Sequence, residues 1–318
     1  SAVSITAAHA QETLSMRDLT VIPPTVTVNV DPGGKSEGII KLINDGSDPL
    51  TLHVDTQDFI VTDPHGVPTL LPPNTYSAKY SAATWVGVAP STFTIAPHQK
   101  AELNYYIQVP KDARPGGHYT AVIFKPAQNA ATNTTGASVQ TQIGTLFSVH
   151  VNGNILEKAN VVQFLANTFQ EYGPVKISTQ IKNMGDSDIT PQGTITLTDM
   201  FGNRVAAAYL DKNRIFPEAV RDYENSFGQH WMFGRYTATF LASYGAKNNL
   251  PLEASITFIV FPWKVTLVVI LLLIAIVLGV MVWKKRKNQT PKTPEEPTTS
   301  VGAAMTLPQE PTTPSSLG

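Results

Sequence analysis

Residues 26–30 read VTVNV, an alternation of apolar and polar side chains, and the turn residues DPGG follow at 31–34. A period of two places the apolar side chains on one face of a β-strand. The same pattern recurs, with turn residues between the runs, at 38–43, 50–55, 93–95, 101–109, 119–124 and 145–151. Short strands at this spacing are typical of an antiparallel sandwich or barrel, so we predict an all-β fold before position 262.

Three short markers occur twice in the same order along this region. They are Asn44-Asp45-Gly46 and Asn183-Met184-Gly185, Ile95-Ala96-Pro97 and Ile215-Phe216-Pro217, and Gly117-His118-Tyr119 and Gly234-Arg235-Tyr236. An ordered repeat predicts two tandem immunoglobulin-like β-sandwiches, at 19–154 and 155–261. The first copy is longer between its first two markers, which predicts an insertion at 62–84. A long irregular insertion on a compact sandwich is usually functional or mobile.

The C-terminal part contains an apolar stretch, residues 265–283 (VTLVVILLLIAIVLGVMVW), without a single charge. A helix that crosses a bilayer needs about 20 such residues, so we predict one transmembrane helix at 264–283. The interface anchors and the basic stop that follows are Trp263, Trp283, Lys284, Lys285, Arg286 and Lys287. Basic residues favour the cytoplasmic side, which predicts a single-pass plasma-membrane protein with extracellular N-terminal domains and a cytoplasmic C-terminus. The segment 284–318 is rich in Pro, Thr and Ser after its basic start, and we predict that it is disordered.

Two further segments lack strand character. Residues 1–10 (SAVSITAAHA) are similar to the end of a signal peptide, with cleavage expected after Ala10; a loose N-terminus is the alternative. Residues 127–142 are small and polar, which predicts a flexible hairpin loop.

Composition excludes several classes of function. The formal net charge is −1 and there is no cysteine, so we expect no nucleic-acid partner, no disulfide and no catalytic thiol. The seven histidines form no ligand pair such as HxH or HxxxH, and the nucleophile and phosphate-loop motifs of enzymes are absent from the sequence. We therefore predict a protein without a cofactor, a metal or catalytic activity, although two carboxylates across a cleft stay an open alternative.

The candidate binding residues lie in and beside the insertion: Tyr76, Lys79, Tyr80 and Trp85. Exposed aromatic rings stack on sugars or fill a pocket of a partner protein. The alternative for Trp85 is a core position, because residues 84–88 alternate as a strand. Tyr119 and Tyr236 each follow a Gly-x pair at the start of a strand, and we predict that both are structural corner tyrosines.

The first sandwich also resembles a known family in Ala96-Pro97, in Val109-Pro110-Lys111 and in residues 115–119 leading to Phe124. These runs are similar to the peptidoglycan-binding domain of the WxL-interacting surface proteins of Gram-positive bacteria. Residues 220–221 and 233–236 of the second sandwich look more like related bacterial surface proteins. The resemblance implies non-catalytic binding to peptidoglycan and to partner proteins at the cell surface.

Three hypotheses for the function follow. The leading one is a single-pass surface protein whose ectodomain binds peptidoglycan, another cell-wall glycan or surface partner proteins. The alternative is a membrane-anchored sensor or assembly chaperone that pairs a client strand with a sandwich edge. An enzyme, or a subunit of an enzyme complex, is the third.

Overall fold

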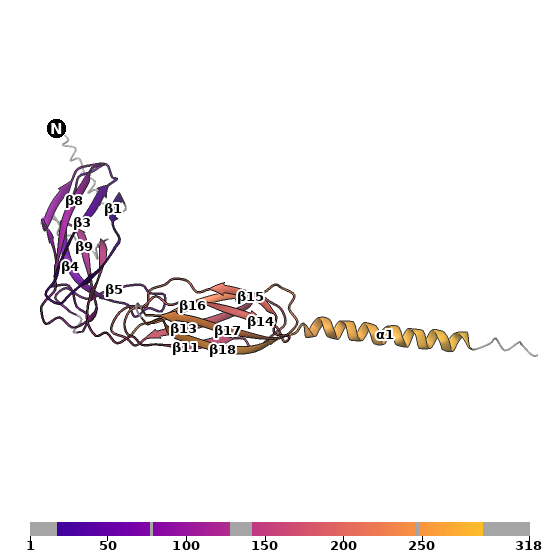
Figure 1. Cartoon of the computed structure of the whole chain (residues 1–318). Coiled ribbons are helices and arrows are strands. Elements are labelled where there is room, and N and C mark those ends of the chain that lie inside the picture. The colour runs from indigo at the N-terminus through magenta and orange to yellow at the C-terminus, as the bar shows by residue number, and fades with distance from the viewer. Residues whose placement is uncertain (1–17, 77–78, 128–141, 246–247, 289–318) are drawn as a thin grey trace, which may run out of the picture. The chain divides into compact units, whose positions relative to one another are not determined.

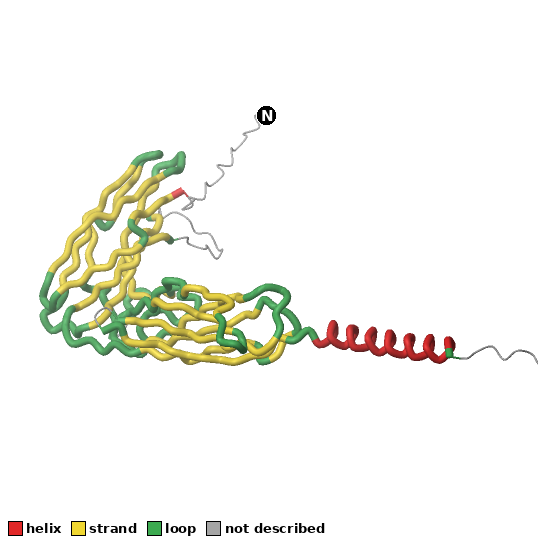
Figure 2. The backbone as a smooth tube through the Cα atoms, turned by 45° about the vertical axis from the view of Figure 1, so that its right-hand side comes forward, coloured by secondary structure: helices red, strands yellow, loops and turns green. Residues whose placement is uncertain are grey.

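The computed structural model describes residues 18–76, 79–127, 142–245 and 248–288, which form β-strands followed by one helix (Figure 1). The predicted signal remnant at 1–10, the tail from 289 onward and most of the predicted loop at 127–142 lie outside the described residues. The prediction of a mostly β chain with one helix is confirmed (Figure 2).

The first sandwich consists of two sheets around one core. One sheet has the order β1-β3-β8-β6, with strands at Leu19–Ile22, Lys35–Asn44, Lys100–Gln108 and Val86–Ala89. The other has the order β2-β10-β9-β4-β5, at Thr25–Val30, Ile143–Val151, Gly116–Pro126, Leu50–Ile60 and Thr69–Leu70, and β7 (Thr92–Ile95) also pairs with β4. Inward-facing residues of both sheets, such as Leu42 and Phe147, are fully buried in this core.

The first two strands, β1 and β2, lie in different sheets. β1 pairs with β3, whereas β2 pairs in parallel with β10 after only two intervening residues, Pro23 and Pro24. A proline has no N–H to donate to a ladder, so the pair ends one strand and lets the chain cross to the other sheet.

The second sandwich has its own core. One sheet has the order β11-β13-β16, at Ala159–Ala166, Val175–Asn183 and Val220–Phe227. The other has the order β12-β18-β17-β14-β15, at Phe169–Gln170, Leu250–Val260, Gly234–Tyr244, Gln192–Thr198 and Arg204–Tyr209. Phe240 and Phe258 are among its fully buried side chains. β18 is paired with β17 over its whole length, from Leu250 to Val260.

The repeated markers of the sequence correspond to a repeated hydrogen-bond network. In the first sandwich the buried Asn44 donates from Nδ2 to the carbonyl of Ile95, at 3.2 Å. In the second, the buried Asn183 donates from Nδ2 to the carbonyl of Ile215, at 2.9 Å. The first two markers of each copy are therefore joined directly, although they are far apart in the sequence.

The insertion at 62–84 packs on the outer face of the first sandwich. Leu70 and Tyr80 cover a small apolar cluster that includes Phe59, Tyr119 and Ile123. These residues point away from the main core, and Phe216 of the second sandwich covers them together with the insertion. The insertion thus has a packing role in addition to any binding role.

The helix α1 spans Trp263–Lys287 and is longer than the predicted span at both ends. It is the one helix among the described residues that is long and apolar enough to cross a membrane. Its last turn contains the basic residues Lys284, Lys285, Arg286 and Lys287.

Replacing Tyr236 by phenylalanine is expected to lower the free energy of unfolding by about 1 kcal/mol, the net value of one hydrogen bond. The Tyr236 hydroxyl donates to the carbonyl of Phe233 and accepts from its N–H, both at 3.2 Å. The measurement is a urea titration of the full chain in detergent, with Tyr209→Phe as the control because Tyr209 is 83% exposed. An unchanged midpoint in Tyr236→Phe would contradict the role of this hydroxyl.

Candidate functional site

A buried charged cluster joins the two sandwiches. Asp188, in the turn between β13 and β14, has its Oδ1 2.6 Å from Nε2 of His150 on β10. The same oxygen accepts a hydrogen bond from the Tyr119 hydroxyl at 2.8 Å. Its Oδ2 lies 3.1 Å from Nε of Arg214. The Asp188 carboxylate therefore has partners on both sandwiches.

The electrostatics of this cluster keep Asp188 ionised. Burial raises the pKa of the Asp188 carboxyl, but the hydrogen bond with His150 and the charge of Arg214 lower the pKa by more than burial raises it. The pKa therefore lies below its ordinary value. Arg214 also donates to the hydroxyls of Ser148, at 2.9 Å, and Thr27, at 3.2 Å. Within the described residues, no group of three or more His, Cys, Asp or Glu side chains is placed to hold a metal ion.

Two of the predicted binding residues contact the second sandwich. Lys79 Nζ lies 3.3 Å from Asp186 Oδ1 and 3.5 Å from Glu218 Oε1. The Tyr80 hydroxyl donates to Glu218 Oε1 at 2.9 Å. A hollow of about 320 Å³ lies beside them, with aromatic walls that include Phe59, Tyr80, Tyr119 and Phe216. Lys79 and Tyr80 thus share a partner across the junction.

The other two predicted binding residues lie in different surroundings. Tyr76 is exposed, whereas Trp85 is partly buried against the core of the first sandwich. The Trp85 ring lies 4.3 Å from that of His118, centroid to centroid. The two predicted corner tyrosines differ as well: the Tyr236 hydroxyl bonds back to its own loop, while the Tyr119 hydroxyl bonds to the second sandwich.

A free sheet edge is present in the first sandwich at β6, which pairs with β8 and with no other described strand. The N–H of Gln108 donates to the carbonyl of Trp85 at 2.9 Å, which fixes the alternation of the antiparallel ladder. Gly87 and Ala89 therefore face β8 with their backbone groups, while those of Val86 and Val88 face the free edge. The strand is four residues long and has no charged residue and no proline, two of the features that block such an edge.

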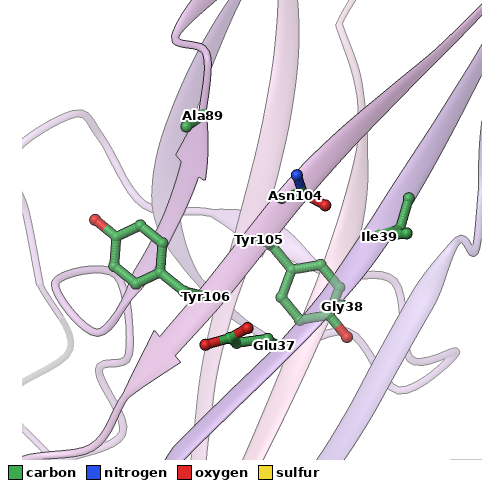
Figure 3. Close-up of a pocket in the computed structure, with 7 residues that line it drawn as sticks. All are labelled: Glu37, Gly38, Ile39, Ala89, Asn104, Tyr105 and Tyr106. Atoms are coloured by element: carbon green, nitrogen blue, oxygen red, sulfur yellow. The ribbon is translucent and has the colours of Figure 1, made fainter.

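A shallow hollow of about 540 Å³ lies on the outer face of the sheet next to this edge (Figure 3). In the close-up, Tyr106 and Ala89 lie toward the β6 side of the hollow, and Ile39 lies toward the opposite side. Tyr106 is 56% exposed. Its ring leans over Gly87, since a Cβ added there would lie 2.2 Å from the ring. The glycine is therefore required for this ring position.

Polar groups complete the hollow. The register places Glu37 directly opposite Tyr106, and Asn104 opposite both Ile39 and Ala89. The hollow thus combines an exposed aromatic ring, a carboxylate and an amide above an open edge. It can hold a large side chain of a segment that pairs with β6.

Sequence reasoning missed both the charged cluster and this hollow. The alternation at 101–109 puts Tyr106 on the outer face, together with Asn104, and an exposed tyrosine in mid-strand was the available signal. No local pattern links Asp188 to Arg214, which is distant in the sequence, or to His150, which Asp188 meets only after the two sandwiches are in contact.

Comparisons with known proteins gave matches among solved structures only. No family model matches the chain, and no curated protein matches it. Similar structures include the class 5 fimbriae chaperone CfaA, with 9% identity and a TM-score of 0.41, covering 74% of this chain and 98% of that one. The CupB2 chaperone of Pseudomonas aeruginosa has 9% identity and a TM-score of 0.36, covering 76% and 100%. The Salmonella enterica SafA pilin–SafB chaperone complex has 13% identity and a TM-score of 0.35, covering 78% and 99%.

The predicted membership of the WxL-interacting family is wrong. No family model supports it, and the similar solved structures are fimbrial chaperones rather than WxL-interacting proteins. The short runs that prompted the resemblance, around Pro97 and at 109–119, are turns and strand starts of the sandwich. Such turns recur in unrelated sandwiches because Pro and Gly meet the same backbone demands in each of them.

Proposed function

We propose that the chain is a non-catalytic, single-pass membrane protein whose first sandwich binds an extended segment of a surface protein at the free edge of β6. The observation that carries this proposal is the combination of an uncharged edge with the hollow beside it. A sensor of exposed strands and an assembly chaperone both need such a site. Each has to recognise an extended segment of its client before that segment is paired elsewhere.

The backbone supplies affinity in this mode of binding. The outward-facing N–H and C=O groups of Val86 and Val88 can pair with a client strand in an extended ladder. Each new hydrogen bond contributes about 1 kcal/mol. Backbone pairing does not depend on the client's sequence, so a few such bonds give only weak and general binding.

Side chains supply selectivity. The outward residues of β6 are Gly87 and Ala89, and the absence of a side chain at Gly87 lets the Tyr106 ring reach over the strand toward the free edge. A large apolar side chain of the client would lie beside Gly87 and contact the ring of Tyr106. We therefore expect a client with alternating apolar residues, of which one is large.

The helix α1 provides the anchor in this proposal. Its 25 residues are more than the number needed to cross a bilayer, and its basic last turn favours a cytoplasmic C-terminus. The sandwiches then lie outside the cytoplasm, where a surface protein is available for binding. Flotation of the full chain with vesicles tests this part by itself.

Replacing Tyr106 by alanine is expected to weaken binding of a strand-like peptide about 30-fold, which corresponds to about 2 kcal/mol for a central aromatic contact. The probes are fluorescently labelled peptides with alternating valine and threonine and one phenylalanine, titrated against the full chain in detergent. Tyr106→Phe is the control, because it keeps the ring. At saturation, we expect slower amide hydrogen exchange at Val86 and Val88.

A second pair of variants tests the edge itself. Val88→Pro removes an outward N–H without touching the ladder to β8, and it is expected to weaken binding. Ala207→Pro makes the same change on β15, an edge strand of the second sandwich, and is the matched control. Loss of binding in Ala207→Pro alone would move the site to β15. A different result would be that the chain pellets with purified peptidoglycan, that Tyr106→Ala abolishes this pelleting and that the chain binds no peptide. The hollow would then bind glycan by stacking, and strand addition would be wrong.

A further inference from the structure

Several loops of the second sandwich lie at the end where its last strand finishes. Gly234, the first residue of β17, pairs with Val260, the last residue of β18. Thr198, at the end of β14, pairs with Thr237 and with Arg204. The turn at 199–203, the loop at 228–233 and the segment at 261–262 therefore lie at the same end of the sandwich.

These loops expose large apolar side chains. Phe201 is 81% exposed, Trp231 66% and Phe233 65%. Trp231 stands edge-on to two rings, Tyr172 at 5.4 Å and His230 at 5.3 Å. Several large aromatic side chains at one end of a soluble domain mark an interaction surface.

Most of these rings pack against neighbouring rings, in two sets. Tyr172 and His230 are stacked, with centroids 4.6 Å apart. Phe233 packs on Phe261 with centroids 5.2 Å apart. The group is thus held in place from the folded side, and its outer side is exposed. We refer to Phe201, Tyr172, His230, Trp231 and Phe233 as the aromatic end.

The chain itself brings this surface close to a bilayer. Only Pro262 separates Phe261 from Trp263, the first residue of α1. Two residues of extended chain span at most about 7 Å. If α1 crosses a membrane, this short link keeps the end of the second sandwich that contains Phe261 next to the bilayer surface.

The chemistry of the loops fits a lipid interface. Tryptophan and tyrosine prefer this region because they combine an apolar ring with a polar group. Glu171 precedes Tyr172 in the chain, and Asp199 is the one acidic residue in the turn at 199–203 and the loop at 228–233. Its Oδ1 accepts the N–H groups of Phe201, at 2.9 Å, and Asn203, at 2.8 Å. The carboxylate is thus occupied within its own turn, and Arg204 and Arg235 nearby favour anionic headgroups.

We propose that the aromatic end inserts into the interfacial region of the bilayer and docks the second sandwich on the membrane. This inference rests on the proposed membrane anchor, and it adds a second, peripheral contact with lipid. The docked sandwich would hold the first sandwich, with its free β6 edge, in a restricted range of positions above the bilayer.

The absence of cysteine from the sequence permits a direct test with single labels. Phe201→Cys and Trp231→Cys are labelled with an environment-sensitive fluorophore in the full chain. The chain is then reconstituted in vesicles of equal parts phosphatidylcholine and phosphatidylglycerol. Tyr209→Cys is the matched control, because it is 83% exposed and lies at the other end of β15.

We expect the emission of the fluorophores at positions 201 and 231 to shift to shorter wavelength in the presence of vesicles. We also expect their fluorescence to be quenched when part of the lipid carries a spin label at a shallow depth. The label at 209 is expected to show neither effect. If the chain floats with the vesicles but the labels at 201 and 231 behave like the label at 209, the docking is overturned and the anchor stands. If the chain does not float, the anchor fails and the docking fails with it. Phe201 is so exposed that its replacement leaves the fold intact, which guards against a folding artefact at 231.

Discussion

Replacing Asp188 by alanine is expected to lower the free energy of unfolding of the strand-rich region by about 3 kcal/mol. Removing one partner of a buried ion pair typically costs about 3–5 kcal/mol, because the remaining groups are left without a counter-charge. His150, Arg214 and the Tyr119 hydroxyl all lose their shared acceptor in this variant. The lower end applies because the Arg214 side chain is 34% exposed and partly solvated.

The measurement is urea unfolding of the full chain in detergent, followed by circular dichroism. Asp112→Ala is the control, since Asp112 is exposed. Asp188→Asn keeps an acceptor for Tyr119 but removes the charge, and we expect a smaller loss than in Asp188→Ala. Equal midpoints for Asp188→Ala and Asp112→Ala would show that the cluster does not hold the sandwiches together.

The same carboxylate predicts a dependence on pH. The pKa of Asp188 in the folded chain lies below its ordinary value of 3.8. The unfolded chain therefore binds this proton more readily, and the stabilisation is fully present above pH 3.8. It is lost as the pH falls from there through the folded pKa. A plot of unfolding free energy against pH should be flatter in Asp188→Ala than in the natural chain over this acidic range.

Replacing Asn183 by alanine is expected to cost about 3 kcal/mol, about 1 kcal/mol for each of three buried hydrogen bonds. Its Nδ2 donates to the carbonyls of Ser187, at 2.8 Å, and Ile215, at 2.9 Å. Its Oδ1 accepts the N–H of Gly185 at 2.8 Å. Alanine leaves these backbone groups without partners, and water does not easily reach them because Asn183 is fully buried.

The control for Asn183 comes from the repeat. Asn44→Ala makes the same change in the first sandwich, where Asn44 has an equivalent set of bonds. Each variant is expected to destabilise its own sandwich, so hydrogen exchange should rise mainly around 183–215 in one and around 44–96 in the other. A change below about 1 kcal/mol in both variants would mean that other contacts hold these turns.

Much of the fold was predictable because strand alternation is a local property. Runs such as 101–109 and 145–151 fall on strands of the structure within one or two residues. The strand β4 is longer than expected and reaches Ile60, because its last part alternates poorly where the insertion covers its outer side. The pattern alone could not show which strands pair, or that one chain segment serves both sheets at Pro23-Pro24.

The candidate sites were less predictable for a related reason. Tyr119 and Tyr236 follow the same marker, yet their hydroxyls bond to different parts of the molecule. The second sandwich lies next to the Tyr119 hydroxyl, whereas the described partners of the Tyr236 hydroxyl lie in its own loop. Sequence spacing defines the position of a residue in its own sandwich. The contact between sandwiches then determines what that residue binds.

The complete pairing of β18 has a mechanical consequence. If α1 anchors the chain in a membrane as proposed, tension between a bound partner and the membrane enters the second sandwich at Val260, which two residues separate from the helix. A pull along the strand loads its whole ladder with β17 in shear, from Leu250 to Val260, instead of opening the pairs one by one. With this anchor, the second sandwich would transmit force, and we expect the first sandwich or a bound client to yield before it does.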